Sequence, residues 1–312
     1  MGKLAYVFPG QGSQSVGMLS DLASEQVLIE ETFAEASEAL GYDLWLLVQS
    51  DPEDKLNQTE FTQPALLSAG IAIWRVALAL GATRPEVVAG HSLGEYSALV
   101  AAESLQFSDA VKLVQQRGRF MQTAVPLGKG GMAAVLGLED DVVREICAKC
   151  SSGVELVQAA NYNAPGQVVI AGSNAALELA IEALKDAGAK RAMPLAVSAP
   201  FHSELMKPAA EKMADVLADV IISNPTIQIL QNVDAAYHSS ADAIRPNLVT
   251  QMYSAVLWTE TTQRLVADGV TTIVECGPGK VLTGLNKRID KSIEGYAINS
   301  VESLASTLES LG

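Results

Sequence analysis

The run Gly90-His91-Ser92-Leu93-Gly94 constrains the fold of this chain most, because it lies between the apolar stretch Val87-Val88-Ala89 and the helical stretch Glu95 to Ala102. A G-x-S-x-G run between a strand and a helix is typical of a nucleophile elbow, in which flanking glycines allow a sharp turn and the serine hydroxyl stays exposed. The Leu93 N–H, at the helix start, would then face a negative charge developing beside Ser92. The alternative is a glycine-bounded helix start with Ser92 as its N-cap; the pattern favours the elbow.

Strands and helices alternate around this run. The hydrophobic periodicity predicts strands at Lys3 to Phe8 and Glu86 to Ala89, and helices at 28–40, 64–81, 93–103 and 107–125. Such alternation predicts an α/β fold with a parallel sheet. The apolar stretch Leu66 to Gly81 carries Arg75 and is shorter than the ~20 residues of a membrane span, so we expect a buried helix there.

The pattern changes between residues 127 and 198. Strands are predicted at 132–138, 154–160, 167–171 and 190–197, helices at 139–150 and 174–187, and a turn at 163–166. The order β-α-β-β-α-β is that of the ferredoxin-like unit. We therefore expect a ferredoxin-like subdomain at 127–198, inserted into a parallel-sheet core formed by 1–126 and 199–312.

Composition and charge exclude several classes of protein. The chain has 312 residues, of which 49% are hydrophobic and 18% charged, so it can bury a core. Its net charge of −15 repels phosphate backbones, and nucleic acid is not an expected partner. The first residues form no apolar signal region, and the cysteines Cys147, Cys150 and Cys276 are too few for a disulfide framework. We expect a cytoplasmic protein that binds neither a membrane nor a metal.

A nucleophilic serine needs a base, and the chain offers three histidines. His91 directly precedes Ser92, where the elbow points its side chain away from the hydroxyl, so a packing role is expected. His238 lies in the polar stretch 232–240, interpreted as a surface loop. His202 follows Pro200-Phe201 where the insert returns to the core, and it is the predicted base; the alternative is a hydrogen-bonded loop histidine.

Arg117 is the candidate for substrate charge. In the predicted helix 107–125 it shares an apolar stripe with Val114 and Met121, whereas Arg119 faces solvent. A buried guanidinium needs a partner, because an unpaired buried charge is costly. Periodicity leaves two partners open, a protein carboxylate or a substrate carboxylate.

Several ordered motifs together resemble the malonyl-CoA:acyl-carrier-protein transacylase family of bacterial fatty-acid synthesis. They are Phe8-Pro9-Gly10-Gln11-Gly12-Ser13-Gln14, Gly90-His91-Ser92-Leu93-Gly94-Glu95-Tyr96, Asn161-Tyr162-Asn163-Ala164-Pro165-Gly166-Gln167, Pro200-Phe201-His202-Ser203 and Glu275-Cys276-Gly277-Pro278-Gly279-Lys280-Val281-Leu282. The resemblance covers essentially the whole chain. It implies an α/β-hydrolase-like catalytic core with a ferredoxin-like subdomain, and an acyltransferase that works by a ping-pong mechanism with coenzyme A thioester as substrate and no permanently bound cofactor.

The same resemblance implies roles for single residues. Ser92 would be the nucleophile and His202 the base; Gln11 and Leu93 would supply the oxyanion N–H groups; Arg117 would bind the malonyl carboxylate; and the backbone carbonyl near Gln251 would orient His202. Malonyl-CoA and acyl carrier protein, bound transiently, would be the partners.

Carrier proteins of this pathway are acidic as a class, so we expect a local basic rim at the mouth of the cleft; the alternative is a set of scattered solvated charges. The rim residues are Lys190, Arg191, Lys280, Lys287 and Arg288.

Two other functions share part of the pattern. A serine hydrolase or thioesterase would have the same elbow. A non-catalytic carrier-binding protein would keep the rim and dispense with Ser92 and His202, so the presence of both residues argues against it.

Overall fold

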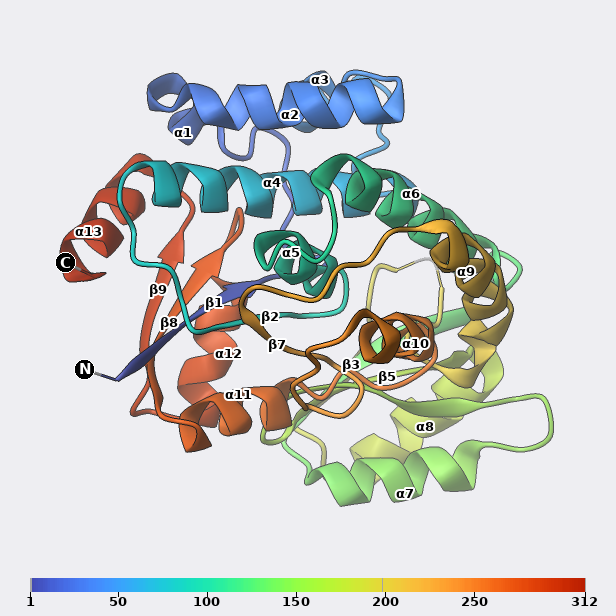
Figure 1. Cartoon of the computed structure of the whole chain (residues 1–312). Coiled ribbons are helices and arrows are strands. Elements are labelled where there is room, and N and C mark those ends of the chain that lie inside the picture. Colours follow the sequence, from blue (N-terminus) through green and yellow to red (C-terminus); the bar gives the residue numbers. More distant parts are fainter. Residues whose placement is uncertain (1, 198, 312) are drawn as a thin grey trace.

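The computed structural model describes residues 2–197 and 199–311, in which two β-sheets are covered by helices (Figure 1). All strand pairs of the first sheet are parallel, and the strand order is β7-β2-β1-β8-β9. In that order the strands are Gln228–Leu230, Val87–Gly90, Lys3–Phe8, Val270–Cys276 and Glu294–Ile298. Parallel strands need crossover connections, and helices provide them here.

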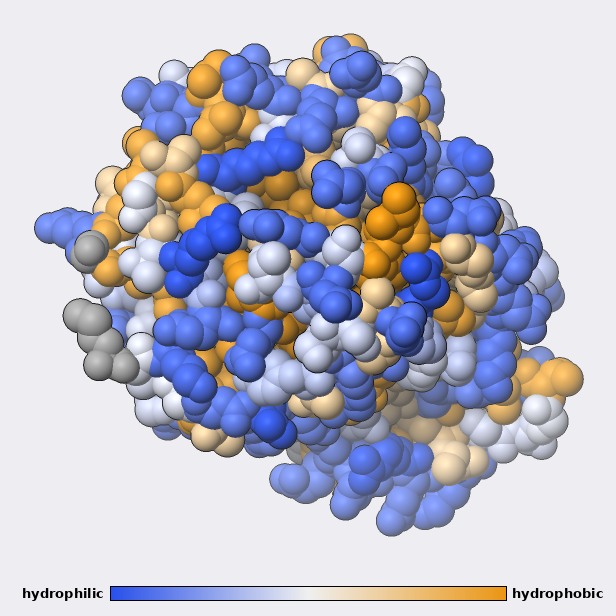
Figure 2. Space-filling model, in the orientation of Figure 1, coloured by the Kyte–Doolittle hydropathy of each residue, from blue (hydrophilic) through white to orange (hydrophobic). Residues whose placement is uncertain are grey.

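The two faces of this sheet are buried in different cores because side chains alternate along each strand. In β1, Tyr6 and Phe8 pack into one hydrophobic cluster with α4, α5 and α6, whereas Ala5 and Val7 face a second cluster with α11 and α12. The helices around this sheet are α1 Ser20–Glu25, α2 Val27–Leu40, α3 Leu44–Ser50, α4 Thr59–Ala79, α5 Gly94–Ala101, α6 Phe107–Thr123, α9 Lys207–Asp219, α10 Ala241–Gln251, α11 Trp258–Ala267, α12 Val281–Ile289 and α13 Val301–Leu311, with the 3₁₀ turn η1 Glu204–Met206. The side of the molecule shown in Figure 2 is mostly hydrophilic, with hydrophobic residues in small groups.

The second sheet is antiparallel and has the strand order β4-β5-β3-β6. Its elements are β3 Gly130–Leu136, α7 Asp140–Cys150, β4 Val157–Ala164, β5 Gln167–Ser173, α8 Asn174–Asp186 and β6 Arg191–Pro194. The helices α7 and α8 cover one face of the sheet around a third hydrophobic cluster (Figure 1). The expected fold class is confirmed. The boundary at 127–198 stays a proposal, and its last residue, Ser198, lies outside the described residues.

Helix α4 begins earlier than the sequence predicts. The hydrophobic periodicity predicts a start at 64, but the helix begins at Thr59 and Pro64 lies inside it. A proline so close to the start removes only the bond to the Glu60 carbonyl, which the helix tolerates. By length and composition α4 could cross a membrane, but 83% of its most apolar window is buried inside the protein. The prediction of a buried helix is confirmed.

Strand β4 extends beyond its predicted end. The sequence predicts a strand at 154–160 followed by a turn from Asn163, whereas β4 continues to Ala164 and the turn is confined to Pro165 and Gly166. The added residues pair with β5 across the two-residue turn, where Tyr162 lies opposite Val168 and Ala164 opposite Gln167. A contact distant in sequence adds to this, because the Tyr162 N–H donates to the Val256 carbonyl and the Val256 N–H donates to the Ala160 carbonyl.

Candidate active site

The serine of the elbow lies in a sharp turn between β2 and α5. Ser92 has φ 51°, a left-handed conformation that costs a non-glycine residue about 1–2 kcal/mol. A Cβ on Gly90 would overlap with the backbone of Gly94, and a Cβ on Gly94 would overlap with the carbonyl of Phe8. Both glycines are therefore required by backbone contacts, which favours the elbow over a simple helix cap.

His202 lies against the serine hydroxyl. Its Nε2 is 2.6 Å from Ser92 Oγ, and its Nδ1 is 2.8 Å from the backbone oxygen of Gln251, the last residue of α10. Because a carbonyl only accepts, Nδ1 carries the proton and Nε2 is free to accept one from the serine. The side chain is buried, which lowers the pKa of His202 to about 3, with the nearby Arg117 charge as the next cause. The imidazole is therefore neutral at pH 7 and can act as a base.

Arg117 of α6 is 1% exposed and points at the same hydroxyl. Nη2 donates to Ser92 Oγ at 3.2 Å and to Gln251 Oε1 at 2.8 Å, and Nη1 donates to Gln63 Oε1 at 2.8 Å. Burial lowers the pKa of Arg117, although an arginine stays charged.

No carboxylate lies within ion-pair distance of this guanidinium in the part of the chain that the structure describes. Arg119, by contrast, is exposed and pairs with Glu60, as its predicted outward position requires. Of the two partners left open by the sequence, the structure offers no protein carboxylate to Arg117. A cation held only by neutral oxygens, beside a nucleophile, is suited to bind an anionic substrate group.

Two backbone N–H groups are candidates for an oxyanion hole at Ser92. Leu93 follows Ser92 directly, and Gln11 follows β1, which pairs with β2 through Phe8 and Gly90. Within residues 2–197 and 199–311, neither N–H has a hydrogen-bond acceptor. The Gln251 side chain donates from Nε2 to the Ser92 carbonyl at 3.0 Å, which orients the peptide that carries the Leu93 N–H. Free donors beside a reacting serine are what an oxyanion hole requires.

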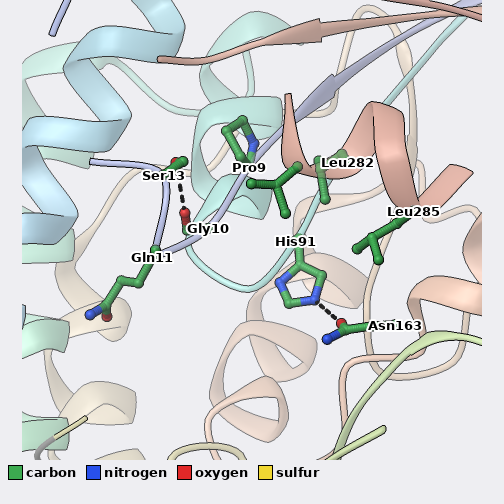
Figure 3. Close-up of a pocket in the computed structure, with 10 residues that line it drawn as sticks. Pro9, Gly10, Gln11, Ser13, His91, Asn163, Leu282 and Leu285 are labelled. Atoms are coloured by element: carbon green, nitrogen blue, oxygen red, sulfur yellow. Dashed lines mark hydrogen bonds between the residues drawn. The ribbon is translucent and has the colours of Figure 1, made fainter. Parts of the chain in front are cut away.

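His91 lies on the other side of the elbow, as expected. Its Nε2 is 2.8 Å from Asn163 Oδ1, and its ring lies 5.7 Å from that of Trp258. Burial lowers its pKa. Figure 3 shows His91 and Asn163 below Gly10 and Leu282, where they line a cavity of about 140 Å³ together with Gln11. This cavity opens beside the Gln11 turn and is a candidate channel for a narrow substrate arm.

The rim residues gather at one end of the antiparallel sheet. Leu136 pairs with Arg191 on one side and with Gln167 on the other, and Arg288 Nη1 donates to Gln167 Oε1 at 2.8 Å. Lys190 and Lys287 adjoin these arginines in sequence, and Lys280 precedes Val281, which lines the cavity. The structure thus brings four basic residues to the same sheet end, with the fifth beside the cavity.

Sequence reasoning missed three buried amides at the site. The Gln63 and Gln251 side chains hold Arg117, and Asn232 is fully buried although the stretch 232–240 was expected to be a surface loop. That expectation was wrong for Asn232 because the residue directly follows β7, at the same sheet edge as Ser92. The only sequence signal was the apolar pattern of Ile227, Ile229 and Leu230 ahead of it. His238 does lie farther out, where it pairs with Asp234.

The chain is similar to a family of enzymes over nearly its whole length. Residues 5–305 match the acyl transferase domain family. The chain is 54% identical to the malonyl CoA-acyl carrier protein transacylase of Haemophilus influenzae over 312 residues, which is 100% of both chains. It is similar to an acyl carrier protein S-malonyltransferase from Vibrio cholerae, with a TM-score of 0.95, 54% identity and coverage of 98% and 99%. It is also similar to the malonyl-transacylase solved in complex with its type II PKS acyl-carrier protein, with a TM-score of 0.97, 51% identity and 99% coverage of both chains.

Proposed function

This chain belongs to the acyl transferase family, and we propose that it moves a malonyl group from malonyl-CoA to the phosphopantetheine thiol of acyl carrier protein, by way of an ester on Ser92. The observation that carries the proposal is the contact of one hydroxyl with both a neutral imidazole and a buried cation. We propose that the reaction belongs to fatty-acid biosynthesis; the name of the Haemophilus influenzae relative supports the malonyl donor and the carrier-protein acceptor.

In the first half-reaction, His202 Nε2 accepts the Ser92 proton while Oγ attacks the thioester carbonyl carbon. The N–H groups of Gln11 and Leu93 stabilise the oxyanion that forms. When the C–S bond breaks, the proton passes from His202 to the sulfur, and coenzyme A leaves. The malonyl group remains as an ester on Ser92, with its free carboxylate on Arg117.

In the second half-reaction, His202 takes the proton of the phosphopantetheine thiol. The sulfur attacks the ester carbonyl carbon, the C–O bond breaks, and the proton returns to Ser92 Oγ. Because coenzyme A leaves before the carrier thiol reacts, the kinetics are ping-pong. The Gln251 carbonyl keeps His202 in the same tautomer through both steps.

We also propose that the basic residues Lys190, Arg191, Lys280, Lys287 and Arg288 receive the acidic carrier protein. The region 127–198 carries a net charge of −2 and the remainder −13, so the ferredoxin-like subdomain repels an acidic partner less than the core does. Docking at this end of the sheet would place the carrier arm beside the cavity lined by Gln11 and His91.

The proposal also covers the location, cofactors, partners and domain organisation of the enzyme. We propose that it acts in the cytoplasm without a permanently bound cofactor or metal, and that it binds neither nucleic acid nor membrane. The catalytic core consists of 1–126 and 199–312, with 127–198 as the inserted subdomain.

A product measurement separates this function from a thioesterase. The enzyme is incubated with malonyl-CoA and holo acyl carrier protein, and malonyl-carrier thioester and free malonate are quantified from the same sample. We expect the thioester as the main product, and none from Ser92→Ala. Free malonate as the main product, independent of the carrier concentration, would identify a hydrolase instead.

A further inference from the structure

Three fully buried polar residues beside the site have no part in the steps above. Glu95 lies in the first turn of α5, and Gln231 and Asn232 directly follow β7; each is 0% exposed. Burying such groups is unfavourable unless each is hydrogen-bonded. Their bonds converge on the turn that carries Ser92.

The side-chain amide of Asn232 holds the backbone that leads into Ser92, on both sides of His91. Its Oδ1 accepts from the Ser92 N–H at 2.7 Å, and its Nδ2 donates to the Gly90 carbonyl at 2.6 Å. Since a backbone N–H only donates and a carbonyl only accepts, the amide fits in one orientation only. The two bonds hold the two successive peptides that lead into Ser92, 90–91 and 91–92, and so restrict the direction of the Ser92 Cα–Cβ bond.

Glu95 in turn holds Asn232 in place. Its Oε2 accepts from the Asn232 backbone N–H at 2.7 Å, and its Oε1 accepts from Gln231 Nε2 at 2.9 Å. The Asn232 carbonyl accepts from the Leu257 N–H, so the backbone is held at both ends. Because Glu95 belongs to the helix that starts at the Ser92 turn, the contacts form a closed ring from the turn through Glu95 and Asn232 back to Ser92.

The left-handed φ of Ser92 makes this ring functionally relevant. A residue stays in a strained backbone conformation only where the surrounding contacts hold it there. Strain of this kind is common at active sites, where a reacting group must be held in one orientation. Relaxation of the turn would move Oγ away from His202 Nε2 and rotate the Leu93 N–H away from the oxyanion. A nucleophile displaced by about 1 Å can lose about a hundredfold in rate.

We propose that Asn232 is a positioning residue for acyl transfer, which keeps the Ser92 turn in its reactive conformation, and that Glu95 acts through Asn232. The inference rests on the proposed function, because it concerns the same nucleophile. The proposal makes the reactivity of Ser92 depend on the Asn232 amide, which follows β7, in addition to His202 and the oxyanion donors.

The test uses a fluorophosphonate, which esterifies an activated serine without needing malonyl recognition. Loss of both amide bonds in Asn232→Ala should lower the second-order rate of Ser92 labelling by about tenfold or more. It should lower kcat for malonyl and acetyl transfer equally, with KM for both thioesters little changed. Asn232→Asp keeps the acceptor for the Ser92 N–H but loses the donor to Gly90, and should show a smaller loss.

Asn286→Ala is the matched control. Asn286 is also buried, and its Oδ1 accepts from Trp258 and Thr262, away from the serine. We expect its loss to lower the melting temperature without changing the labelling rate of the folded enzyme. If Asn232→Ala does not fold, the Asn232→Asp rate decides. Glu95→Gln added to Asn232→Ala should reduce the rate by less than about threefold, because Glu95 acts through Asn232.

An unchanged labelling rate in folded Asn232→Ala would overturn the inference. If Asn232→Ala does not fold, an unchanged labelling rate in Asn232→Asp would overturn it instead. Equal rate losses in Asn232→Ala and Asn286→Ala would do the same, since they would indicate a general effect of packing. A further large loss on adding Glu95→Gln would overturn the role given to Glu95. If the wild type took up no malonyl group at Ser92, the proposed function would fail instead, and labelling by the fluorophosphonate would still report on the turn.

Discussion

We expect Arg117 to give the enzyme its preference for malonyl over acetyl groups, and replacing Arg117 with methionine tests this expectation. Arg117→Met keeps much of the buried volume and removes the charge, so it disturbs the packing of α6 less than alanine would. The variant also loses the bond from Nη2 to Ser92 Oγ, which affects every acyl group alike. Only the malonyl group loses a partner for its free carboxylate, and the ratio of the two transfer rates isolates that loss.

The size of the effect follows from the surroundings of the guanidinium. Arg117 is 1% exposed and its partners Gln63 and Gln251 are neutral, so its bond to the malonyl carboxylate would be a desolvated, charge-assisted hydrogen bond. A hydrogen bond to a charged group contributes about 1.5 to 3 kcal/mol. The ratio of malonyl to acetyl transfer should therefore fall by about ten- to a hundredfold.

The assay measures kcat/KM for malonyl-CoA and acetyl-CoA with the same carrier protein. Arg119→Met is the matched control, since Arg119 lies on the same helix but is exposed and paired with Glu60. The control should leave the ratio unchanged, because an exposed ion pair contributes little. Equal losses for both thioesters in Arg117→Met would refute the role of Arg117 as the carboxylate anchor.

Four further predictions concern the base, the turn and the rim. Because burial lowers the pKa of His202 to about 3, ester formation should not decline on acidification from about pH 8 to about pH 6; a decline with a midpoint near 6.5 that Ser92 labelling shares would contradict this. The same shift should lower the free energy of unfolding below about pH 6.5, where the unfolded chain binds a proton that the folded chain does not. Gly90→Ala should lower the melting temperature or prevent folding, because its Cβ overlaps with the backbone of Gly94, and a wild-type melting curve would refute that overlap. Replacing both Lys287 and Arg288 with glutamate should raise KM for the carrier protein several-fold at low salt, and an unchanged KM would remove both residues from the rim.

The sequence predicts the fold where local pattern and tertiary structure agree. Lys3 to Phe8 is apolar, is followed by a turn, and forms β1 over the same residues. The end of β4 differs from the prediction because residues 163–166 have the composition of a four-residue turn, whereas Ala164 pairs with Gln167 of β5 and only Pro165 and Gly166 form the turn. The start of α4 differs from the prediction because hydrophobic periodicity follows the apolar residues, whereas the first turns of the helix bury the polar side chains of Thr59, Thr62 and Gln63.

The site residues likewise fall into two groups, those that local sequence identifies and those that only the three-dimensional contacts identify. Ser92 is recognisable because its glycines are its immediate neighbours, and the constraint that they satisfy is local. The role of Asn232 could not be recognised, because its two side-chain bonds go to a turn about 140 residues away, and the apolar residues ahead of it indicate a strand but no contact with Ser92. The side chain of Gln251 was missed for a related reason: the resemblance points to its backbone carbonyl, whereas the contacts with Arg117 and with the Ser92 carbonyl appear only in three dimensions.

The most direct evidence would come from the intact mass of the protein after mixing with malonyl-CoA, followed by peptide mapping. With no carrier present, we predict one added malonyl group on the peptide that contains Ser92, none on Ser92→Ala, and its complete release when holo acyl carrier protein is added. A malonyl group that stays on the Ser92→Ala protein, or that maps to any other residue of the wild type, would contradict catalysis through this serine.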